Sequence, residues 1–166
     1  MFQQIILLNG PSSSGKSTLA RALRALIRER RNEDYEIVSI DDFLELSQDQ
    51  TIYEDDVFEI SGRLCKRTLS ALGTAPGVIV DHVITSERIF RQLQTACSAV
   101  PLRPVRVSCP LEVLQAREKA RGNRSSGSAE ASLAYLYPKD GYELTVDTHA
   151  MTAEACAERI LAALFR

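Results

Sequence analysis

Residues 5–18, Ile5-Ile6-Leu7-Leu8-Asn9-Gly10-Pro11-Ser12-Ser13-Ser14-Gly15-Lys16-Ser17-Thr18, join an apolar run to a loop rich in glycine and serine. The apolar run predicts a buried strand, and from Ser17 onward the apolar residues recur with a helical period. Between the two, the glycines, the lysine and the serine match the phosphate-loop pattern G-x-x-x-x-G-K-[ST] without a mismatch. Because the pattern requires a strand before it and a helix after it, we predict a nucleotide-binding loop here.

The chemistry of this loop suits a nucleoside triphosphate. Gly10 and Gly15 permit backbone angles that are closed to other residues, so successive N–H groups can turn inward around the β-phosphate. Lys16 brings a positive charge to the β- and γ-phosphate oxygens, Ser17 offers a hydroxyl to Mg²⁺, and the helix N-terminus adds its partial positive charge. The alternative is an ordinary turn before a helix, and the agreement of strand, loop length, lysine and hydroxyl argues against it. The predicted nucleotide-binding residues are Gly10, Ser12, Ser13, Ser14, Gly15, Lys16, Ser17 and Thr18.

The composition narrows the class of protein. The chain has 166 residues, the length of one domain, and its 45% hydrophobic residues are enough to bury a sizeable core. A net charge of −2 gives no general electrostatic case for binding nucleic acid. We therefore expect one domain over residues 1–166 and no nucleic-acid partner.

The sequence also argues against a membrane or secreted location. No apolar run approaches membrane-spanning length, and the amino terminus has no basic stretch followed by an apolar one. The four cysteines stand far apart without C-x-x-C spacing, which predicts neither a zinc site nor a disulfide framework. We expect a cytoplasmic protein with no membrane partner and with buried reduced thiols at Cys65, Cys97, Cys109 and Cys156.

Strand and helix patterns alternate along the chain. This alternation is typical of α/β proteins, so we predict a three-layer α/β/α sandwich with a mostly parallel sheet of about five strands, the P-loop NTPase or kinase fold. The predicted strands are 3–8, 36–40, 78–81, 105–108 and 142–146, and the predicted helices are 17–31, 57–72, 85–98, a segment from 109 onward and 151–165.

Asp41 and Asp42 directly follow the second predicted strand, before Phe43 and Leu44 begin a helical piece. In open α/β sheets, ligands bind outside the carboxyl ends of the strands, so an acid here faces the predicted γ-phosphate. A carboxylate in that place can orient a substrate hydroxyl and accept its proton during phosphoryl transfer. One of the two can instead cap the next helix. We predict that Asp41 is the catalytic base and that Asp42 is the cap.

The third predicted strand, 78–81, ends in a carboxylate and has the form of a Walker B strand. Asp81 is a candidate to hold Mg²⁺ together with Ser17, or to touch the acceptor. A carboxylate that satisfies loop amides is the alternative, and the sequence leaves both open. His82 comes next, and we expect it to be structural.

Arginines gather beside a glycine- and serine-rich stretch in the second half of the chain. Arg117 and Arg121 lie on one predicted helix, and Arg124 follows it. Because the chain carries a phosphate loop, we interpret residues 121–130 as a mobile lid whose guanidinium groups cover the triphosphate. An exposed basic helix end is the simpler alternative. The catalytic candidates are thus Asp41, Lys16, Arg121 and Arg124, and Arg117 joins the nucleotide-binding group.

Taken together, these features resemble the chloramphenicol phosphotransferase-like family of P-loop kinases. The resemblance includes the phosphate loop, Ile40-Asp41 after the second strand, and the strand 78–81. Two further blocks, residues 117–124 and 142–148, are more specific, because many families share the phosphate loop. The resemblance extends over most of the chain, with residues 45–75 as the exception.

The resemblance implies a P-loop kinase that transfers the γ-phosphate of ATP, with Mg²⁺, to a hydroxyl of a small molecule. Asp41 takes the family's base position, and Lys16 and the lid arginines stabilise the phosphates. The acceptor of the family's namesake is an antibiotic alcohol. Here His82 stands where that enzyme has a second aspartate, and residues 43–72, where we expect the acceptor pocket, depart from it. The reaction type is therefore carried over and the acceptor stays open.

Other functions stay open at this point. One is a regulatory nucleotide-binding NTPase or switch that acts on a protein partner. The sequence has no N-K-x-D guanine signature, which argues against this function. Another is a nucleoside or nucleotide kinase, which the sequence alone hardly distinguishes from a kinase of other small molecules. A degenerate module without catalysis predicts a damaged loop, whereas this loop is intact. The oligomeric state does not follow from the sequence.

Overall fold

The computed structural model describes residues 2–44, 53–122 and 126–166. Within them, five strands form one sheet in the order β2-β3-β1-β4-β5, and every neighbouring pair is parallel. The strands are β1 (Gln4–Asn9), β2 (Glu36–Ser39), β3 (Gly77–His82), β4 (Leu102–Ser108) and β5 (Leu144–Asp147). The helices are α1 (Lys16–Arg31), α2 (Glu54–Leu72), α3 (Glu87–Ala96), α4 (Leu111–Arg121), α5 (Ser128–Tyr135) and α6 (Ala153–Leu164), with a 3₁₀ turn at Ile40–Asp42.

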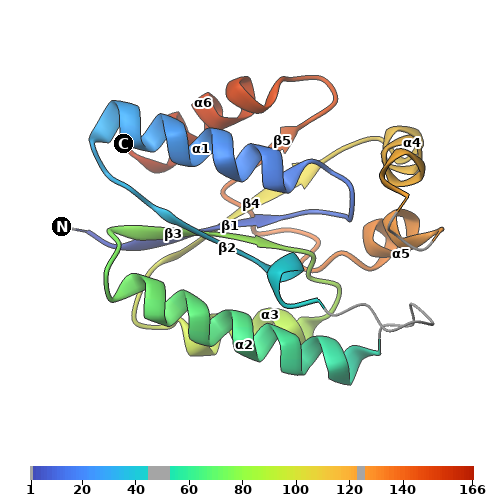
Figure 1. The fold of residues 1–166 in the computed structure, drawn as a ribbon, viewed down its shortest axis with the longest axis horizontal. Coiled ribbons are helices and arrows are strands. Elements are labelled where there is room, and N and C mark those ends of the chain that lie inside the picture. The colour runs from blue at the N-terminus through green and yellow to red at the C-terminus, as the bar shows by residue number, and fades with distance from the viewer. Residues whose placement is uncertain (1, 45–52, 123–125) are drawn as a thin grey trace.

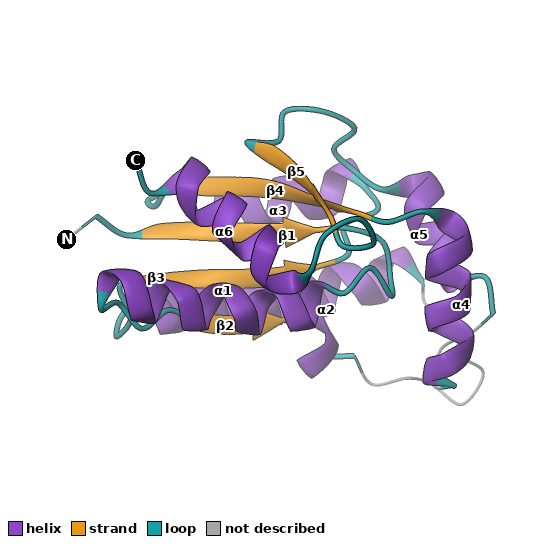
Figure 2. Ribbon diagram, turned by 90° about the horizontal axis from the view of Figure 1, so that it is seen from above, coloured by secondary structure: helices purple, strands orange, loops and turns teal. Residues whose placement is uncertain are grey.

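The elements form three layers. Helices α1 and α6 cover one face of the sheet, and α2 and α3 cover the other (Figure 1). Helices α4 and α5 stand beyond one end of the sheet, as the view from above shows (Figure 2). The predicted three-layer α/β/α fold is confirmed, and the sheet of the described residues is wholly parallel.

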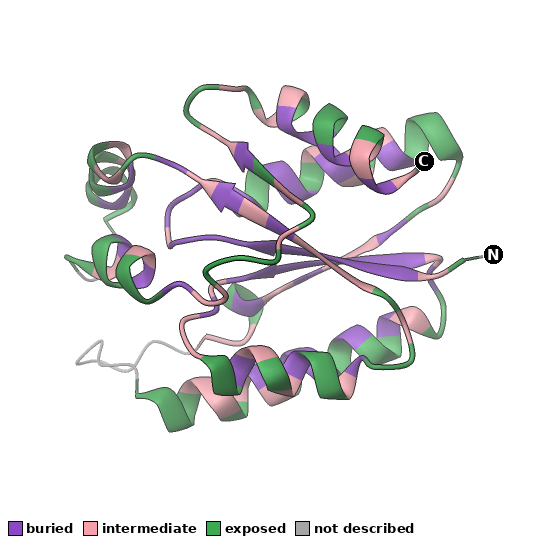
Figure 3. Cartoon of the chain, turned by 180° about the vertical axis from the view of Figure 1, so that it is seen from behind, coloured by how far each residue is buried: buried purple, intermediate pink, exposed green. Residues whose placement is uncertain are grey.

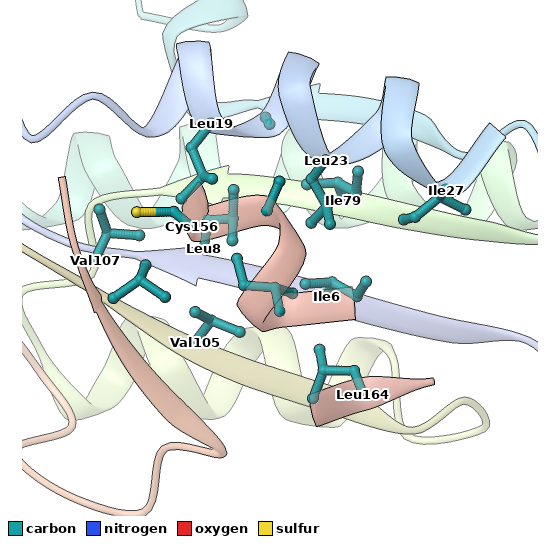
Figure 4. Packing of buried hydrophobic residues seen from close by; sticks show 14 of the residues in the cluster. Ile6, Leu8, Leu19, Leu23, Ile27, Ile79, Val105, Val107, Cys156 and Leu164 are labelled. Atoms are coloured by element: carbon teal, nitrogen blue, oxygen red, sulfur yellow. The ribbon is translucent and has the colours of Figure 1, made fainter. Parts of the chain in front are cut away.

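The central strand β1 explains why both faces are covered. All six of its residues are buried, and the sheet is the most buried layer of the molecule (Figure 3). Successive side chains point to opposite faces, so Ile6 and Leu8 pack beneath α1 and α6 (Figure 4), whereas Ile5 and Leu7 pack toward α2 and α3. An apolar run of this kind fits a parallel sheet that is buried on both sides.

All five strands differ from the predicted limits, β1 and β3 by one residue at each end. Strand β2 stops at Ser39, and β5 covers Leu144–Asp147 rather than 142–146. Strand β4 begins at Leu102 and includes Pro104, although proline is normally excluded from sheet interiors. Pairing between β4 and β5 begins only at Val105, so the missing N–H of Pro104 removes no bond from that ladder.

Two helical predictions near Asp41 are wrong in detail. The short helix spans Ile40–Asp42 and does not begin at Phe43, and its N-cap is Ser39. Asp42 does not cap the next described helix, because the N-cap position of α2 is Tyr53. Part of the predicted acceptor segment, residues 45–52, lies outside the described residues.

Helix α5 was not predicted. Its hydrophobic residues do not form a clear stripe at helical spacing, which is the main signal for a helix in a sequence. Contacts from other elements hold it instead, as described below.

The cysteines agree with the expectation of buried reduced thiols. All four cysteines are buried and unpaired, and burial raises the pKa of Cys65 to about 11, which keeps that thiol protonated. Among the described helices, none has both the length and the apolar character that a membrane span needs.

Candidate active site

A cavity of about 530 Å³ opens where the carboxyl ends of the strands meet the phosphate loop. Most predicted site residues line it: Ser12, Ser13, Gly15, Lys16, Ser17, Thr18, Asp41, Asp81, Arg117 and Arg121. The sequence analysis had not placed several others in the site: Ile40, Val83, Ala120, Thr148, Met151, Thr152 and Ala153. The last four of these come from the turn after β5 and the start of α6, and only Thr148 among them belongs to a block of the family resemblance, residues 142–148.

The backbone of the phosphate loop depends on its two glycines. Gly15 has φ of 85° and is the N-cap of α1, a left-handed conformation that other residues rarely adopt. Gly10 does not line the cavity. A side chain at Gly10 would collide with the carbonyl oxygen of Val107, so this glycine lets the loop pass close to β4. Ser14, within the loop, is fully buried and is not among the residues that line the cavity.

Lys16 lies across the loop. Its Nζ donates to the carbonyl oxygen of Pro11 at 2.9 Å and contacts Ser14 Oγ at 3.4 Å. The side chain is buried although it lines the cavity. A buried ammonium group at the N-terminus of a 16-residue helix gives this wall a positive potential, which suits a phosphate group.

Ser17 and Asp81 form the pair that was predicted to hold magnesium. Ser17 Oγ donates to Asp81 Oδ2 at 2.9 Å, and Ser39 Oγ donates to the same oxygen at 3.2 Å. Asp81 is buried, and within the described residues it accepts from these hydroxyls rather than from loop amides. The predicted alternative, a carboxylate that satisfies loop amides, finds no such bond among the described residues, and the magnesium-binding role of Asp81 stays a prediction.

These residues fit a magnesium ion. Mg²⁺ in phosphate-transfer sites is held by one or two carboxylates or hydroxyls, with water and substrate phosphates as its other ligands. The buried carboxylate of Asp81 and the hydroxyl of Ser17 are the protein ligands that such a site needs. The described part of the chain has no group of three or more histidines, cysteines or acids that could hold a metal by itself.

Asp41 lies on the 3₁₀ turn after β2, is exposed and lines the cavity. Its backbone N–H donates to Ser39 Oγ at 3.3 Å. Asp42 is exposed in the same turn and is not among the residues that line the cavity. The two neighbouring carboxylates therefore differ in placement, which the sequence could not decide by itself.

Arg117 holds the loop from the side. Its Nη1 contacts Thr148 Oγ1 at 3.3 Å, and its Nη2 donates to the carbonyl oxygen of Thr148 at 3.2 Å. Thr148 Oγ1 in turn donates to the carbonyl oxygen of Ser14 at 2.6 Å. Arg117 thus links α4, the phosphate loop and the turn after β5.

The predicted lid is described only in part. Arg121 lines the cavity as the last residue of α4 and is exposed, whereas Arg124 lies outside the described residues. The chain resumes at residue 126, and α5 starts at Ser128, inside the segment 121–130. The mobility of this segment stays a prediction.

Buried polar contacts hold α5 in place. The carboxylate of Glu118, on α4, accepts the backbone N–H groups of Ala129 at 2.9 Å and of Gly127 at 3.3 Å. Ser132 Oγ accepts the N–H of Ser12 in the phosphate loop at 2.9 Å. Neither residue was identified from the sequence, because nothing local distinguishes Glu118 from a solvated helix acid.

His82 is fully buried at the end of β3, with Nε2 at 3.1 Å from Ser61 Oγ on α2. Burial, together with the smaller effect of the positive charge of Lys16, lowers the pKa of His82 to about 3. The imidazole is therefore neutral near pH 7, and it is not among the residues that line the cavity.

Comparison with known proteins gives one family match. A model of the family described as chloramphenicol phosphotransferase-like protein matches residues 3–165. No match was found among curated proteins.

Several solved structures share the fold. An APS kinase of Mycobacterium tuberculosis, in complex with AMPPNP and APS, is 17% identical with a TM-score of 0.78, and the match covers 99% of both chains. A gluconokinase from Sinorhizobium meliloti 1021 is 20% identical with a TM-score of 0.77 and covers 99% of this chain and 93% of its own. A shikimate kinase from Acinetobacter baumannii, in complex with shikimate, is 18% identical with a TM-score of 0.68, at coverages of 98% and 93%.

Proposed function

This chain belongs to the chloramphenicol phosphotransferase-like family and is an ATP-dependent kinase of small molecules, and from that premise we propose that it transfers the γ-phosphate of MgATP to a hydroxyl group, with Asp41 as the base. The observation that carries the proposal is the lining of one cavity by the phosphate loop, Asp41 and Asp81. A phosphate-binding wall and a carboxylate that faces it are the two parts that phosphoryl transfer to an alcohol requires.

The proposed reaction joins the acceptor oxygen to the γ-phosphorus. Asp41 accepts a hydrogen bond from the acceptor hydroxyl and orients its oxygen toward the phosphorus atom. As the new O–P bond forms, the bond between the γ-phosphorus and the bridging oxygen of ADP breaks, and the hydroxyl proton passes to the Asp41 carboxylate. Lys16, Arg117 and Arg121 supply positive charge to the phosphate oxygens.

Ser17 and Asp81 would hold the magnesium ion, which neutralises charge on the β- and γ-phosphate oxygens when it is bound. The buried ammonium of Lys16, next to Ser17 at the start of α1, contributes positive charge without a metal. The adenine base of the nucleotide is proposed for the part of the cavity lined by Thr148, Met151, Thr152 and Ala153, beside Arg117, which contacts Thr148.

The chemical identity of the acceptor is the open part of the proposal. The solved relatives are named for APS, gluconate and shikimate as their partners or substrates, and at 17 to 20% identity none of these transfers to this chain. We propose a small molecule with a free hydroxyl that approaches Asp41 from the side of α2.

The test is release of ADP from MgATP by the purified protein, alone and with a panel of hydroxyl compounds: chloramphenicol, other antibiotics, nucleosides and sugars. One compound should raise ADP release and appear as a phosphorylated product in mass spectrometry. A nucleoside as that compound would make the protein a nucleoside kinase within the same reaction class. Lys16→Ala should abolish the stimulated release, because it removes the positive charge on the phosphates.

The proposal would be contradicted by steady ADP release that no compound in the panel changes, provided that Lys16→Ala abolishes this release. That result would favour a regulatory NTPase that acts on a protein partner.

A further inference from the structure

Ser39 links the carboxylate of Asp81 to the backbone of Asp41. Its Oγ donates to Asp81 Oδ2 at 3.2 Å and accepts the backbone N–H of Asp41 at 3.3 Å. A hydroxyl has one donor and two acceptor lone pairs, so one serine can make both bonds at once.

Strand pairing brings these groups together. Ser39 is the last residue of β2 and is paired with Asp81 in the register between β2 and β3. Paired residues on neighbouring parallel strands point to the same face, which places the hydroxyl against the buried carboxylate. The position of Ser39 therefore follows from the sheet and does not require a bound ligand.

Ser39 also fixes where the chain turns. It is the N-cap of the 3₁₀ turn that carries Asp41, with its own backbone still extended (φ −108°, ψ 138°). A 3₁₀ turn of three residues has little internal hydrogen bonding to define its direction. The cap is thus the contact that relates the start of this turn to Asp81.

We propose that Ser39 is a positioning residue that holds Asp41 in register with the magnesium-binding pair of Ser17 and Asp81. The hydrogen bonds run without a break from Ser17 Oγ to Asp81 Oδ2, to Ser39 Oγ and to the N–H of Asp41. Ser39 touches neither the phosphates nor the acceptor in this role. The inference rests on the proposed function, since it concerns the alignment of the proposed base.

The first test compares Ser39→Ala and Ser39→Thr with a matched control. The control is Ser86→Ala, which removes a serine that caps α3 by accepting the N–H of Ile89 at 3.2 Å. With the acceptor found in the panel, Ser39→Ala should lower kcat by about 10- to 100-fold, because a small misplacement of a reacting group costs that much. The KM for ATP should change little, Ser39→Thr should retain most of kcat, and Ser86→Ala should resemble the wild type.

A second measurement does not depend on turnover. The rise in melting temperature caused by ATP is measured in EDTA and again in excess Mg²⁺. Ser39→Ala should keep the rise in EDTA and lose part of the additional rise in Mg²⁺, because the Asp81 carboxylate loses a bond that orients it. Ser39→Thr should restore that additional rise.

Equal kcat and equal Mg²⁺-dependent rises for Ser39→Ala and Ser86→Ala would overturn the positioning role. Failure of the proposed function gives a different pattern, in which no compound stimulates the wild type but the Mg²⁺-dependent rise of Ser39→Ala is still reduced. In that case Ser39 positions Asp81 in a nucleotide site that has another use, and its alignment of Asp41 for transfer is overturned.

Discussion

Ser17 Oγ and Asp81 Oδ2 lie 2.9 Å apart, although 64 residues separate them in the sequence. Their meeting follows from the parallel pairing of β1 and β3, in which Leu8 is opposite Asp81. The phosphate loop begins where β1 ends, at the same edge of the sheet as Asp81. The start of α1, which carries Ser17, therefore lies next to the end of β3. The hydroxyl and the carboxylate proposed to bind magnesium are thus brought together by the fold.

Asp81→Asn should raise the Mg²⁺ concentration needed for half-maximal activity by about 10-fold or more, because an amide keeps the shape of the carboxylate but not its charge. Binding of ATP in EDTA should be nearly unchanged. Both quantities are measured by titration with Mg²⁺ and with ATP. The matched control is Asp34→Asn, which removes the same charge from an exposed carboxylate paired with Arg24. An unchanged Mg²⁺ requirement in Asp81→Asn would remove this residue from the metal site.

Asp41→Asn should lower kcat by about 10²- to 10⁴-fold, because the amide cannot accept the hydroxyl proton. The affinity for MgATP should stay within a few-fold of the wild type, since Asp41 is proposed to contact the acceptor rather than the phosphates. Asp42→Asn is the control: it makes the same change one residue further along the same exposed turn, outside the residues that line the cavity. If the two variants had equal kcat, neither aspartate could be identified as the base.

Arg117→Lys keeps the charge but cannot reproduce the two contacts of the guanidinium with Thr148. We expect the KM for ATP to rise by about 10-fold while kcat changes less, because the loop that receives the phosphates loses its lateral support. Steady-state kinetics and nucleotide titration test this. Arg24→Lys changes a half-buried arginine that is paired with Asp34 and does not line the cavity, and it should leave both constants unchanged. A fall in kcat at constant KM would instead show that Arg117 stabilises the transition state rather than supports the loop.

The phosphate loop was predictable because its residues are contiguous and its chemistry needs a fixed spacing. The positions of Asp41 and Asp81 at the cavity were also predictable, since parallel strands end at one edge and side chains at these ends meet there. In each case, the signal lay within a few residues of a strand that the apolar pattern had already located.

Contacts between distant segments were not predictable. Ser39 looked like an ordinary strand residue, and its importance comes from the register with Asp81. Thr148 belongs to a block that the family resemblance included, but its hydroxyl gains a role through its contacts with Arg117 and with the carbonyl oxygen of Ser14. Helix α5 is held by Glu118 of α4, which accepts two N–H groups at its start, and by Ser132, which accepts the N–H of Ser12. A periodic pattern cannot record such bonds.

His82 should make the protein less stable in weak acid. In the folded state its pKa is lowered to about 3 from an ordinary value of 6.5, so between these values the unfolded chain takes up a proton that the folded chain excludes. The free energy of unfolding is therefore unaffected by this group above about pH 6.5 and falls as the pH decreases below it, by up to about 1.4 kcal/mol per pH unit.

The measurement is urea unfolding from about pH 7.5 down to pH 5, a range that lies above the ordinary pKa values of aspartate and glutamate. His82→Gln removes the titrating group, so its free energy of unfolding should lose most of this dependence on pH, even if the variant is less stable at pH 7.5. The chain has only one other histidine, His149, which is exposed, and His149→Gln should keep the slope of the wild type. An equal slope in both variants would show that His82 accepts a proton in the folded state, and the imidazole would then carry a charge beside Lys16.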